Sequence, residues 1–274
     1  MTRKPAVAGQ FYPGRPEALR SAIEGVSAAP EGARPSPALG VLSPHAGYTF
    51  SGAVMGRLFA QVRVPDTVLL LTPSHAFSQP AFALWTGGGW ETPLGSVAIH
   101  EALTEALARH PGIIPADEPH IPEHSGEVVL PFLQYHNPGV RIAVVCVTVS
   151  ARLPALKEVG AYAAGVLAEL GEDDALIVAS SDMSHEHGRH AREVVRRNDA
   201  VAIERMVALD PDGLYSVCRL EGITMCGVLP AAAMMSGVAA RGGTRGELLG
   251  RATSADSPLG GGDYVVGYAG LRFD

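Results

Sequence analysis

The stretch Thr67-Val68-Leu69-Leu70-Leu71-Thr72, followed at once by Pro73-Ser74-His75, contains a strong strand signal. Its apolar residues are continuous rather than alternating, which is typical of a strand buried on both faces of a parallel sheet. Ligand sites of open α/β sheets lie beyond the carboxyl ends of their strands. His75 follows such an end and is therefore the first candidate functional residue.

Similar segments recur along the chain and alternate with helical patterns. Further strands are predicted at Ala38–Ser43, Arg141–Val149, Ala175–Ser180, Glu247–Thr253 and Tyr264–Phe273. Helices are predicted at Pro16–Ser27, Ser51–Val62, His100–Arg109, Gly126–His136, Pro154–Leu170, His190–Leu209 and Gly227–Ala240. This alternation predicts an α/β fold with a mixed, mostly parallel sheet and helices on both faces.

The connections add further expectations. Ala81–Trp85 and Ser96–Ile99 flank a glycine-rich segment and are predicted to form a small hairpin, and Ala28–Pro37 is predicted to be a linker. Because we find no internal repeat and no break in composition, residues 1–274 are predicted to form one domain.

Composition narrows the classes of function. The chain has 274 residues, of which 47% are hydrophobic, and a formal net charge of -7, which disfavours nucleic acid and anionic membrane surfaces as partners. We find neither an apolar run of roughly 18 residues, as a membrane span needs, nor a signal peptide. Three cysteines cannot all pair with one another. A cytoplasmic protein with reduced thiols is therefore expected.

Chemistry-bearing side chains follow several of the predicted strands. His45, His75 and His185 each come within a few residues of a strand's carboxyl end. Cys226 precedes a helix that starts near Gly227, where the helix dipole favours the thiolate form that binds metals. Parallel strands would bring these groups to one crevice. Taken singly, each histidine is more often an ordinary loop residue, and His187 or His190 is an alternative to His185.

Several stretches together resemble the Memo protein family. The matches run in order across nearly the whole chain and comprise Ala6–Pro13, Pro44-His45-Ala46-Gly47-Tyr48, Pro73-Ser74-His75, Thr92-Pro93-Leu94-Gly95, Glu123-His124-Ser125, Ser180-Ser181-Asp182 with His185, and Cys226-Gly227. Three residues depart from the family pattern: Thr72 stands where glycine is expected, Phe50 where tyrosine is expected, and Gly126 where a bulkier apolar residue is usual.

The resemblance implies a fold like that of the class III extradiol dioxygenases and assigns roles to residues. It implies His45, His75 and Cys226 as metal ligands, with Cys226 in the place of a dioxygenase carboxylate. The expected catalytic residues are His185, Asp182 and His124. The expected substrate-binding residues are Tyr48, Ser74 and Glu123. Taken without the resemblance, Glu123-His124-Ser125 would be a helix start with Ser125 as N-cap.

Two imidazoles and one thiolate suit Fe(II), Cu or Zn by ligand softness. With the resemblance, Fe(II) is favoured, copper comes second and zinc third. The leading hypothesis is a non-haem iron or copper redox enzyme that acts on a small-molecule substrate with O2. The alternatives are a non-catalytic metal- or peptide-binding protein, as an adaptor or metal carrier, and, ranked last, a zinc hydrolase. The resemblance also implies a functional link to a radical-SAM protein.

Overall fold

The centre of the molecule is a parallel sheet built from the predicted apolar runs. The computed structural model describes residues 1–27, 32, 34–260 and 262–274; residues 28–31 and 33 of the predicted linker lie outside the described residues. Four strands, β1 (Gly40–Ser43), β8 (Leu176–Ser180), β2 (Thr67–Pro73) and β7 (Arg141–Val147), lie side by side in that order and are mutually parallel. Every residue of β2 is buried, as its unbroken apolar run predicts.

Antiparallel strands extend this parallel centre on both sides. On one side β11 (Tyr264–Phe273) pairs with β1, and β10 (Gly246–Thr253) pairs with β11. On the other side β3 (Phe82–Leu84) is antiparallel to β7, and β6 (Ile113–Pro115) lies beyond it. The short β9 (His185–His187) pairs with β11. The sheet is therefore mixed and mostly parallel at its centre, as predicted.

The predicted hairpin between Ala81–Trp85 and Ser96–Ile99 is wrong. β5 (Gly95–Ile99) pairs instead with β4 (Trp90–Thr92), with Thr92 opposite Gly95. Gly95 has a φ of +123°, which glycine adopts without strain and which permits this tight reversal. The strand β3 joins the main sheet. A short apolar run predicts that a strand exists but does not predict which strand it pairs with.

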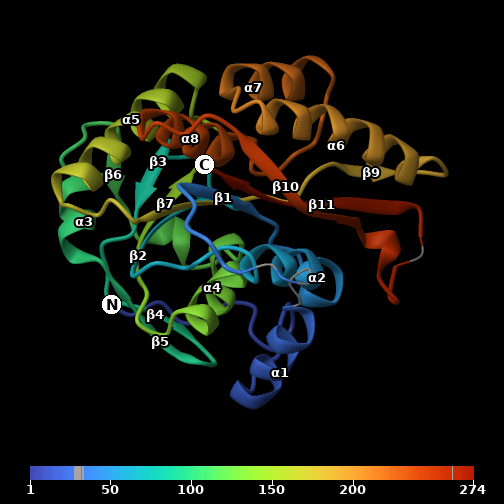
Figure 1. Cartoon of the computed structure of the whole chain (residues 1–274), viewed down its shortest axis with the longest axis horizontal. Coiled ribbons are helices and arrows are strands. Elements are labelled where there is room, and N and C mark those ends of the chain that lie inside the picture. The colour runs from blue at the N-terminus through green and yellow to red at the C-terminus, as the bar shows by residue number, and fades with distance from the viewer. Residues whose placement is uncertain (28–31, 33, 261) are drawn as a thin grey trace.

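Helices cover both faces of the sheet (Figure 1). One face carries α3 (Glu101–Leu107), α5 (Leu153–Glu169), α6 (Ala191–Val207), α7 (Pro211–Leu220) and α8 (Val228–Ala240). The other carries α1 (Pro16–Val26), α2 (Tyr48–Phe59) and α4 (Ser125–His136). All but α7 correspond to predicted helices. Among the helices of the described ranges, none has the length and hydropathy that a membrane crossing requires.

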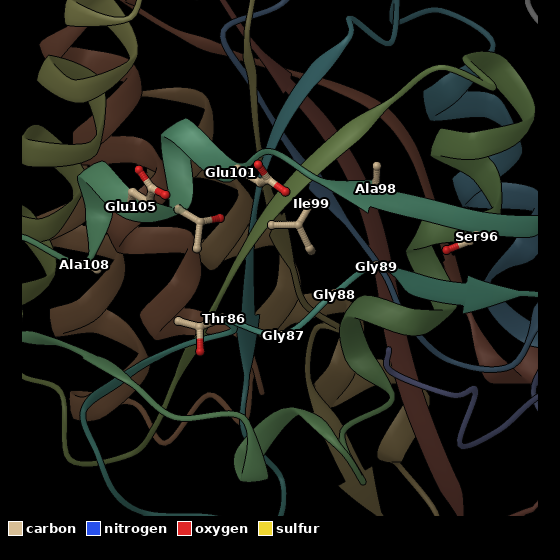
Figure 2. A pocket seen from close by; sticks show the side chains of 11 residues that line it. Thr86, Gly87, Gly88, Gly89, Ser96, Ala98, Ile99, Glu101, Glu105 and Ala108 are labelled. Atoms are coloured by element: carbon tan, nitrogen blue, oxygen red, sulfur yellow. The ribbon is translucent and has the colours of Figure 1, made fainter. Parts of the chain in front are cut away.

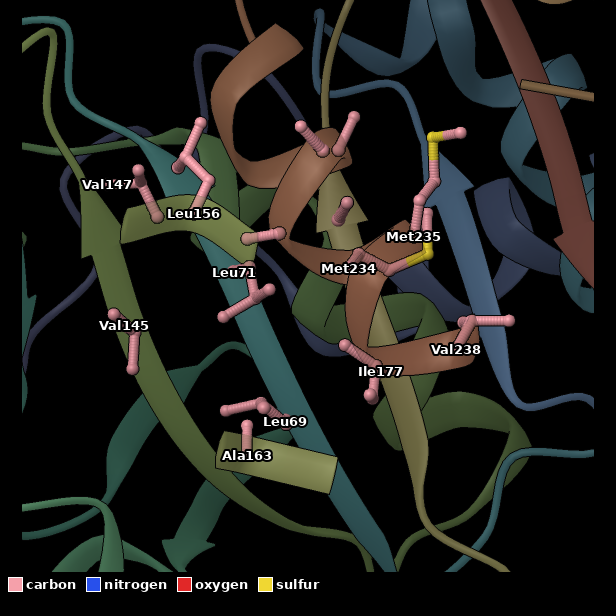
Figure 3. Packing of buried hydrophobic residues seen from close by; sticks show 14 of the residues in the cluster. Leu69, Leu71, Val145, Val147, Leu156, Ala163, Ile177, Met234, Met235 and Val238 are labelled. Carbon is pink, nitrogen blue, oxygen red and sulfur yellow. The ribbon is translucent and has the colours of Figure 1, made fainter. Parts of the chain in front are cut away.

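The tightest packing lies between α5, α8 and the sheet. Leu69, Ile177 and Met234 are fully or nearly fully buried there (Figure 3). A Cβ on Gly160 of α5 would lie 2.2 Å from the carbonyl oxygen of Ala233 in α8, so only glycine allows the two helices to approach this closely. This rigid layer supports β1, β2 and β8, whose carboxyl ends carry the candidate site.

Candidate metal centre

Three histidines meet beyond the carboxyl ends of β1 and β2. His45 follows β1, His75 follows β2, and His124 directly precedes α4. One ring nitrogen from each lies within 4.8 Å of the others. The ring centroids of His75 and His124 are 4.7 Å apart, and each lies 5.4 Å from that of His45. This histidine trio could hold a metal ion, because imidazole nitrogen is a ligand for zinc, copper and iron.

His45 is buried, and a relay of hydrogen bonds sets its tautomer. The Ser180 hydroxyl donates its one hydrogen to the carbonyl oxygen of Ser125, at 2.7 Å. Its oxygen also lies 2.7 Å from His45 Nδ1, which must therefore be the donor. The Nε2 lone pair of His45 is thus left for a ligand. Burial lowers the pKa of His45 well below its usual value, so this ring is neutral.

His75 is held by a carboxylate on both its backbone and its ring. Glu123 accepts the His75 amide at 2.7 Å and His75 Nδ1 at 2.9 Å, and it also accepts the Ser125 amide at 2.9 Å. Burial alone would raise the pKa of Glu123, but these donors outweigh it and hold the pKa below its usual value. The hydrogen bond between Glu123 and His75 Nδ1 raises the pKa of His75. A carboxylate on Nδ1 is the usual support of a metal-binding histidine.

Cys226 lies against His45. Its Sγ is 3.4 Å from His45 Nε2 and accepts the Asp182 amide at 3.2 Å. Gly227 permits this approach, because a Cβ there would lie 2.3 Å from the Ser180 carbonyl oxygen. Burial raises the pKa of Cys226, contrary to the thiolate that the helix dipole would favour. Desolvation therefore dominates, and the thiol stays protonated unless a cation replaces its proton.

Asp182 fixes the backbone around His45. Its carboxylate accepts the amides of His45 at 2.8 Å and Ala46 at 3.2 Å. Burial raises the pKa of Asp182 to about 7, although these two amides oppose the shift. Since its backbone amide also contacts Cys226, Asp182 joins two of the three residues expected to be ligands.

His185 occupies the first position of β9, near the same crevice. Its Nδ1 donates to the Thr224 carbonyl oxygen at 3.2 Å, which leaves Nε2 as the free acceptor. Its ring centroid lies 6.3 Å from that of Tyr264. Of the alternatives, His187 stacks on the same Tyr264 ring, with ring centroids 4.4 Å apart, and His190 Nδ1 lies 3.8 Å from a carboxylate oxygen of Glu193 on α6.

Two residues expected to bind substrate have their hydroxyls engaged within the protein. The Tyr48 hydroxyl donates to the Val128 carbonyl oxygen at 3.1 Å. Ser74 Oγ accepts the Phe77 amide at 3.0 Å and so closes the turn after β2. Their assignment to substrate stays a prediction, as do the catalytic roles of Asp182, His185 and His124.

Sequence reasoning gave no role to two residues that touch the site. Ser180 supports His45, and the signal for it is a hydroxyl at the last position of an otherwise apolar strand. Phe11 packs edge-on against His124, with ring centroids 4.9 Å apart. It belongs to the N-terminal stretch Ala6–Pro13, which resembled the family but contains no charged residue to mark it.

A separate cavity of about 670 Å³ lies between α3 and the glycine-rich segment before β4 (Figure 2). Glu101 and Glu105 line it together with Gly87, Gly88 and Ser96. It shares no lining residue with the histidine trio. In the part of the chain that the structure describes, the histidines that could hold a metal ion lie together at the ends of β1 and β2 and at the start of α4, away from this cavity.

Comparison with known proteins places this arrangement in a family. A family model described as Memo-like protein matches residues 3–272. The chain belongs to the Memo-like family. It is 41% identical to a MEMO1 family protein of Methanopyrus kandleri, covering all of this chain and 99% of that protein. It is 36% identical to a MEMO1 family protein of Aquifex aeolicus, covering 99% and 98%.

The fold of this Memo-like protein is similar to that of a solved structure. An uncharacterized protein from Escherichia coli K12 aligns with a TM-score of 0.53 over 85% of this chain and 98% of that chain. Their sequences are 15% identical, so the likeness concerns the fold alone.

Two departures from the Memo pattern form one contact. A Cβ on Gly126 would lie 2.9 Å from Thr72 Cγ2 and 3.2 Å from Leu70 Cδ2. The Thr72 side chain therefore occupies the space that a side chain at position 126 would need.

Proposed function

We propose that this protein binds a metal ion through His45, His75 and Cys226 and acts as a redox enzyme on a small molecule. The observation that carries the proposal is the pre-orientation of the donors. Ser180 and Glu123 accept the Nδ1 hydrogens of the two histidines, which leaves each Nε2 without a hydrogen; Cys226 Sγ lies 3.4 Å from Nε2 of His45.

The spacing of the donors supports the proposal. Nitrogen and sulfur ligands bound at roughly 2.0–2.3 Å in a tetrahedral arrangement are about 3.6 Å apart. His45 Nε2 and Cys226 Sγ are 3.4 Å apart. This pair of donors therefore fits a metal of the iron, copper or zinc kind, and a ring nitrogen of His75 lies within 4.8 Å of one of His45. We favour iron, with copper second and zinc third, as the family resemblance implies.

A bound iron or copper ion would supply Lewis acidity and one-electron chemistry. The chain would supply proton transfer and substrate binding. His185 would accept or return a proton at Nε2, and the partly exposed ring is suited to this because its Nδ1 is already held. Burial lowers the pKa of His185, which favours the neutral, proton-accepting form.

We place the substrate beside β11, on the side of His185. A cavity of about 380 Å³ there is lined by Phe50, Tyr264, Val266 and Tyr268 together with Ser254, Leu259, Gly260, Gly262 and Asp263, and it shares no lining residue with the histidine trio. Tyr264 faces His185 from this wall. Aromatic walls favour a substrate with an aromatic or apolar part and a polar end directed at the histidines.

We also place the protein in a reducing compartment, since Cys146, Cys218 and Cys226 are all unpaired.

A metal carrier is the second candidate, and the histidine trio is the observation that favours it. If His124 and Cys226 both joined His45 and His75, four protein donors would close a tetrahedral shell. Closed shells are typical of sites that hold a metal without catalysis. Full occupancy without turnover would support this candidate over the enzyme.

The test is metal analysis of the anaerobically purified protein beside His45→Ala, His75→Ala and Cys226→Ser. Each substitution should remove most of the metal while the circular dichroism stays unchanged. His185→Ala should keep the metal and lose O2 consumption, measured with an oxygen electrode and a screen of diols, aminophenols and thiols. His124→Ala should lose metal if His124 is a ligand, and should keep the metal but lose O2 consumption if His124 transfers protons. A wild-type protein that takes up neither Fe(II), Cu(I) nor Zn(II) would contradict the proposal.

A further inference from the structure

A buried arginine joins the N-terminal segment to the metal centre. Arg3 is 2% exposed, and its guanidinium lies 4.3 Å from the centre of the Trp90 ring. It forms an ion pair with Glu127 of α4, at 2.7 Å between Nη1 and Oε2. A buried arginine is normally explained by the anion that it pairs with. Here the pair uses only part of the guanidinium.

The remaining donors of Arg3 bind the backbone that carries two site residues. Nε donates to the His120 carbonyl oxygen at 2.7 Å, and Nη2 donates to the Glu123 carbonyl oxygen at 2.6 Å. The second bond fixes the peptide between Glu123 and His124. Residues 121–124 lie between a short 3-10 helix (Glu118–His120) and α4, outside regular secondary structure. Arg3 therefore supplies hydrogen bonds that a strand or helix would otherwise give to this segment.

Glu127 fixes the other side of the contact. Its carboxylate accepts the amides of Ala6 and Val7, at 2.7 and 2.9 Å, and the Tyr12 hydroxyl at 2.7 Å. The N-terminal segment that is held in this way also carries Phe11, whose ring packs against His124. Two independent contacts of one segment thus converge on the Glu123–His124 peptide.

We propose that Arg3 is a positioning residue of the metal centre, which holds the Glu123–His124 peptide so that Glu123 can orient His75 and His124 can face the site. This inference rests on the proposed metal-binding function. The fork of donors matters, because lysine would keep the charge beside Glu127 but could not reach the two carbonyl oxygens and the carboxylate together.

The experiment compares Co²⁺ binding by the wild type, Arg3→Lys and Ile23→Ala, with visible absorption bands as the readout of the ligand set and thermal unfolding as the readout of stability. Ile23 of α1 is fully buried among apolar side chains and is not among the hydrogen-bond, ion-pair or ring partners of the Arg3 guanidinium, so its substitution lowers stability by another route. Arg3→Lys should bind Co²⁺ about 10-fold more weakly, the lower end for a supporting partner of a metal ligand. It should also shift the absorption bands, while Ile23→Ala binds within about twofold of wild type.

Three results would overturn the inference. Arg3→Lys could bind Co²⁺ like the wild type, or Ile23→Ala could lose as much affinity, and in either case the proposed function would stand. A wild type that binds no Co²⁺ would instead remove the proposed function and this inference together. If Arg3→Lys does not fold, Glu127→Gln gives the same comparison, because it keeps the side-chain shape and removes the charge that orients Arg3.

Discussion

Removal of the Ser180 hydroxyl tests whether the tautomer of His45 is set by the protein. In Ser180→Ala, His45 Nδ1 loses the oxygen that accepts its hydrogen at 2.7 Å, and the Ser125 carbonyl oxygen loses its donor at the same distance. Both atoms stay buried, because His45 is 2% exposed and Ser125 is 0% exposed. The free imidazole can then move its hydrogen to Nε2, where it would block the metal.

The size of the effect follows from two separate estimates. A buried polar group that loses its partner costs about 1–3 kcal/mol. Loss of an outer partner of a metal-binding histidine costs about 10–100-fold in metal affinity, which corresponds to about 1.4–2.7 kcal/mol. The ranges overlap. Ser180→Ala should therefore weaken Co²⁺ or Zn²⁺ binding by about 10–100-fold.

The assay is a competition titration with a coloured chelator, and Ser43→Ala is the matched control. Ser43 lies opposite Ser180 in the β1–β8 ladder and is equally buried, but its hydroxyl donates to the Pro44 carbonyl oxygen. The control removes the same atom one strand away and should bind metal within about twofold of wild type. Equal affinities for Ser180→Ala and wild type, or equal losses in both variants, would refute the reasoning.

Three further predictions concern packing and charge near the site. Gly126→Ala should lower the free energy of unfolding by about 1–3 kcal/mol, because its Cβ would lie 2.9 Å from Thr72 Cγ2. In urea unfolding, the Thr72→Ala/Gly126→Ala double variant should lose less free energy of unfolding than the two single variants lose together. Strictly additive losses would argue against the contact. Gly227→Ala should lower both the melting temperature and the metal content, because its Cβ would lie 2.3 Å from the Ser180 carbonyl oxygen; a variant with wild-type values of both would show that the helix can shift. Burial raises the pKa of Asp199 to about 6, although the Ser184 amide partly opposes this. The native state therefore binds more protons than the unfolded state between about pH 4 and pH 6, so this carboxyl lowers stability as the pH rises through that window. Asp199→Asn should be more stable than wild type at pH 8, by at most about 3 kcal/mol, and should lose this advantage at pH 4; an equal difference at both pH values in thermal unfolding would exclude the carboxyl as the cause.

The local pattern of apolar and polar residues was enough to predict most of the helices and strands. The run Thr67–Thr72 predicted β2 because burial on both faces leaves an unbroken apolar stretch, and the observed strand extends one residue further, to Pro73. Tyr264–Phe273 was predicted with its observed bounds. The hairpin was wrong because β3 is short and pairs with the distant β7, whereas β5 turns back onto its neighbour β4 and also pairs with β7.

The gathering of the site was also predictable in outline. Parallel strands end at one edge, so histidines that follow β1 and β2 must lie near each other, and His45 and His75 do. The sequence also indicated Cys226, because it precedes a helix whose dipole favours thiolate, but burial outweighs that dipole and raises the pKa of the thiol.

Only the tertiary structure decided how these residues behave. His45 and Ser180 are 135 residues apart in the chain, His75 and Glu123 are 48 apart, and Arg3 and Glu123 are 120 apart. A hydrogen bond requires two atoms within about 3 Å, and no local window of sequence contains both partners. The tautomers of the histidines, the protonated Cys226 and the support that Arg3 gives to Glu123 therefore arise only when the chain is packed, whereas strand and helix patterns are determined by neighbouring residues alone.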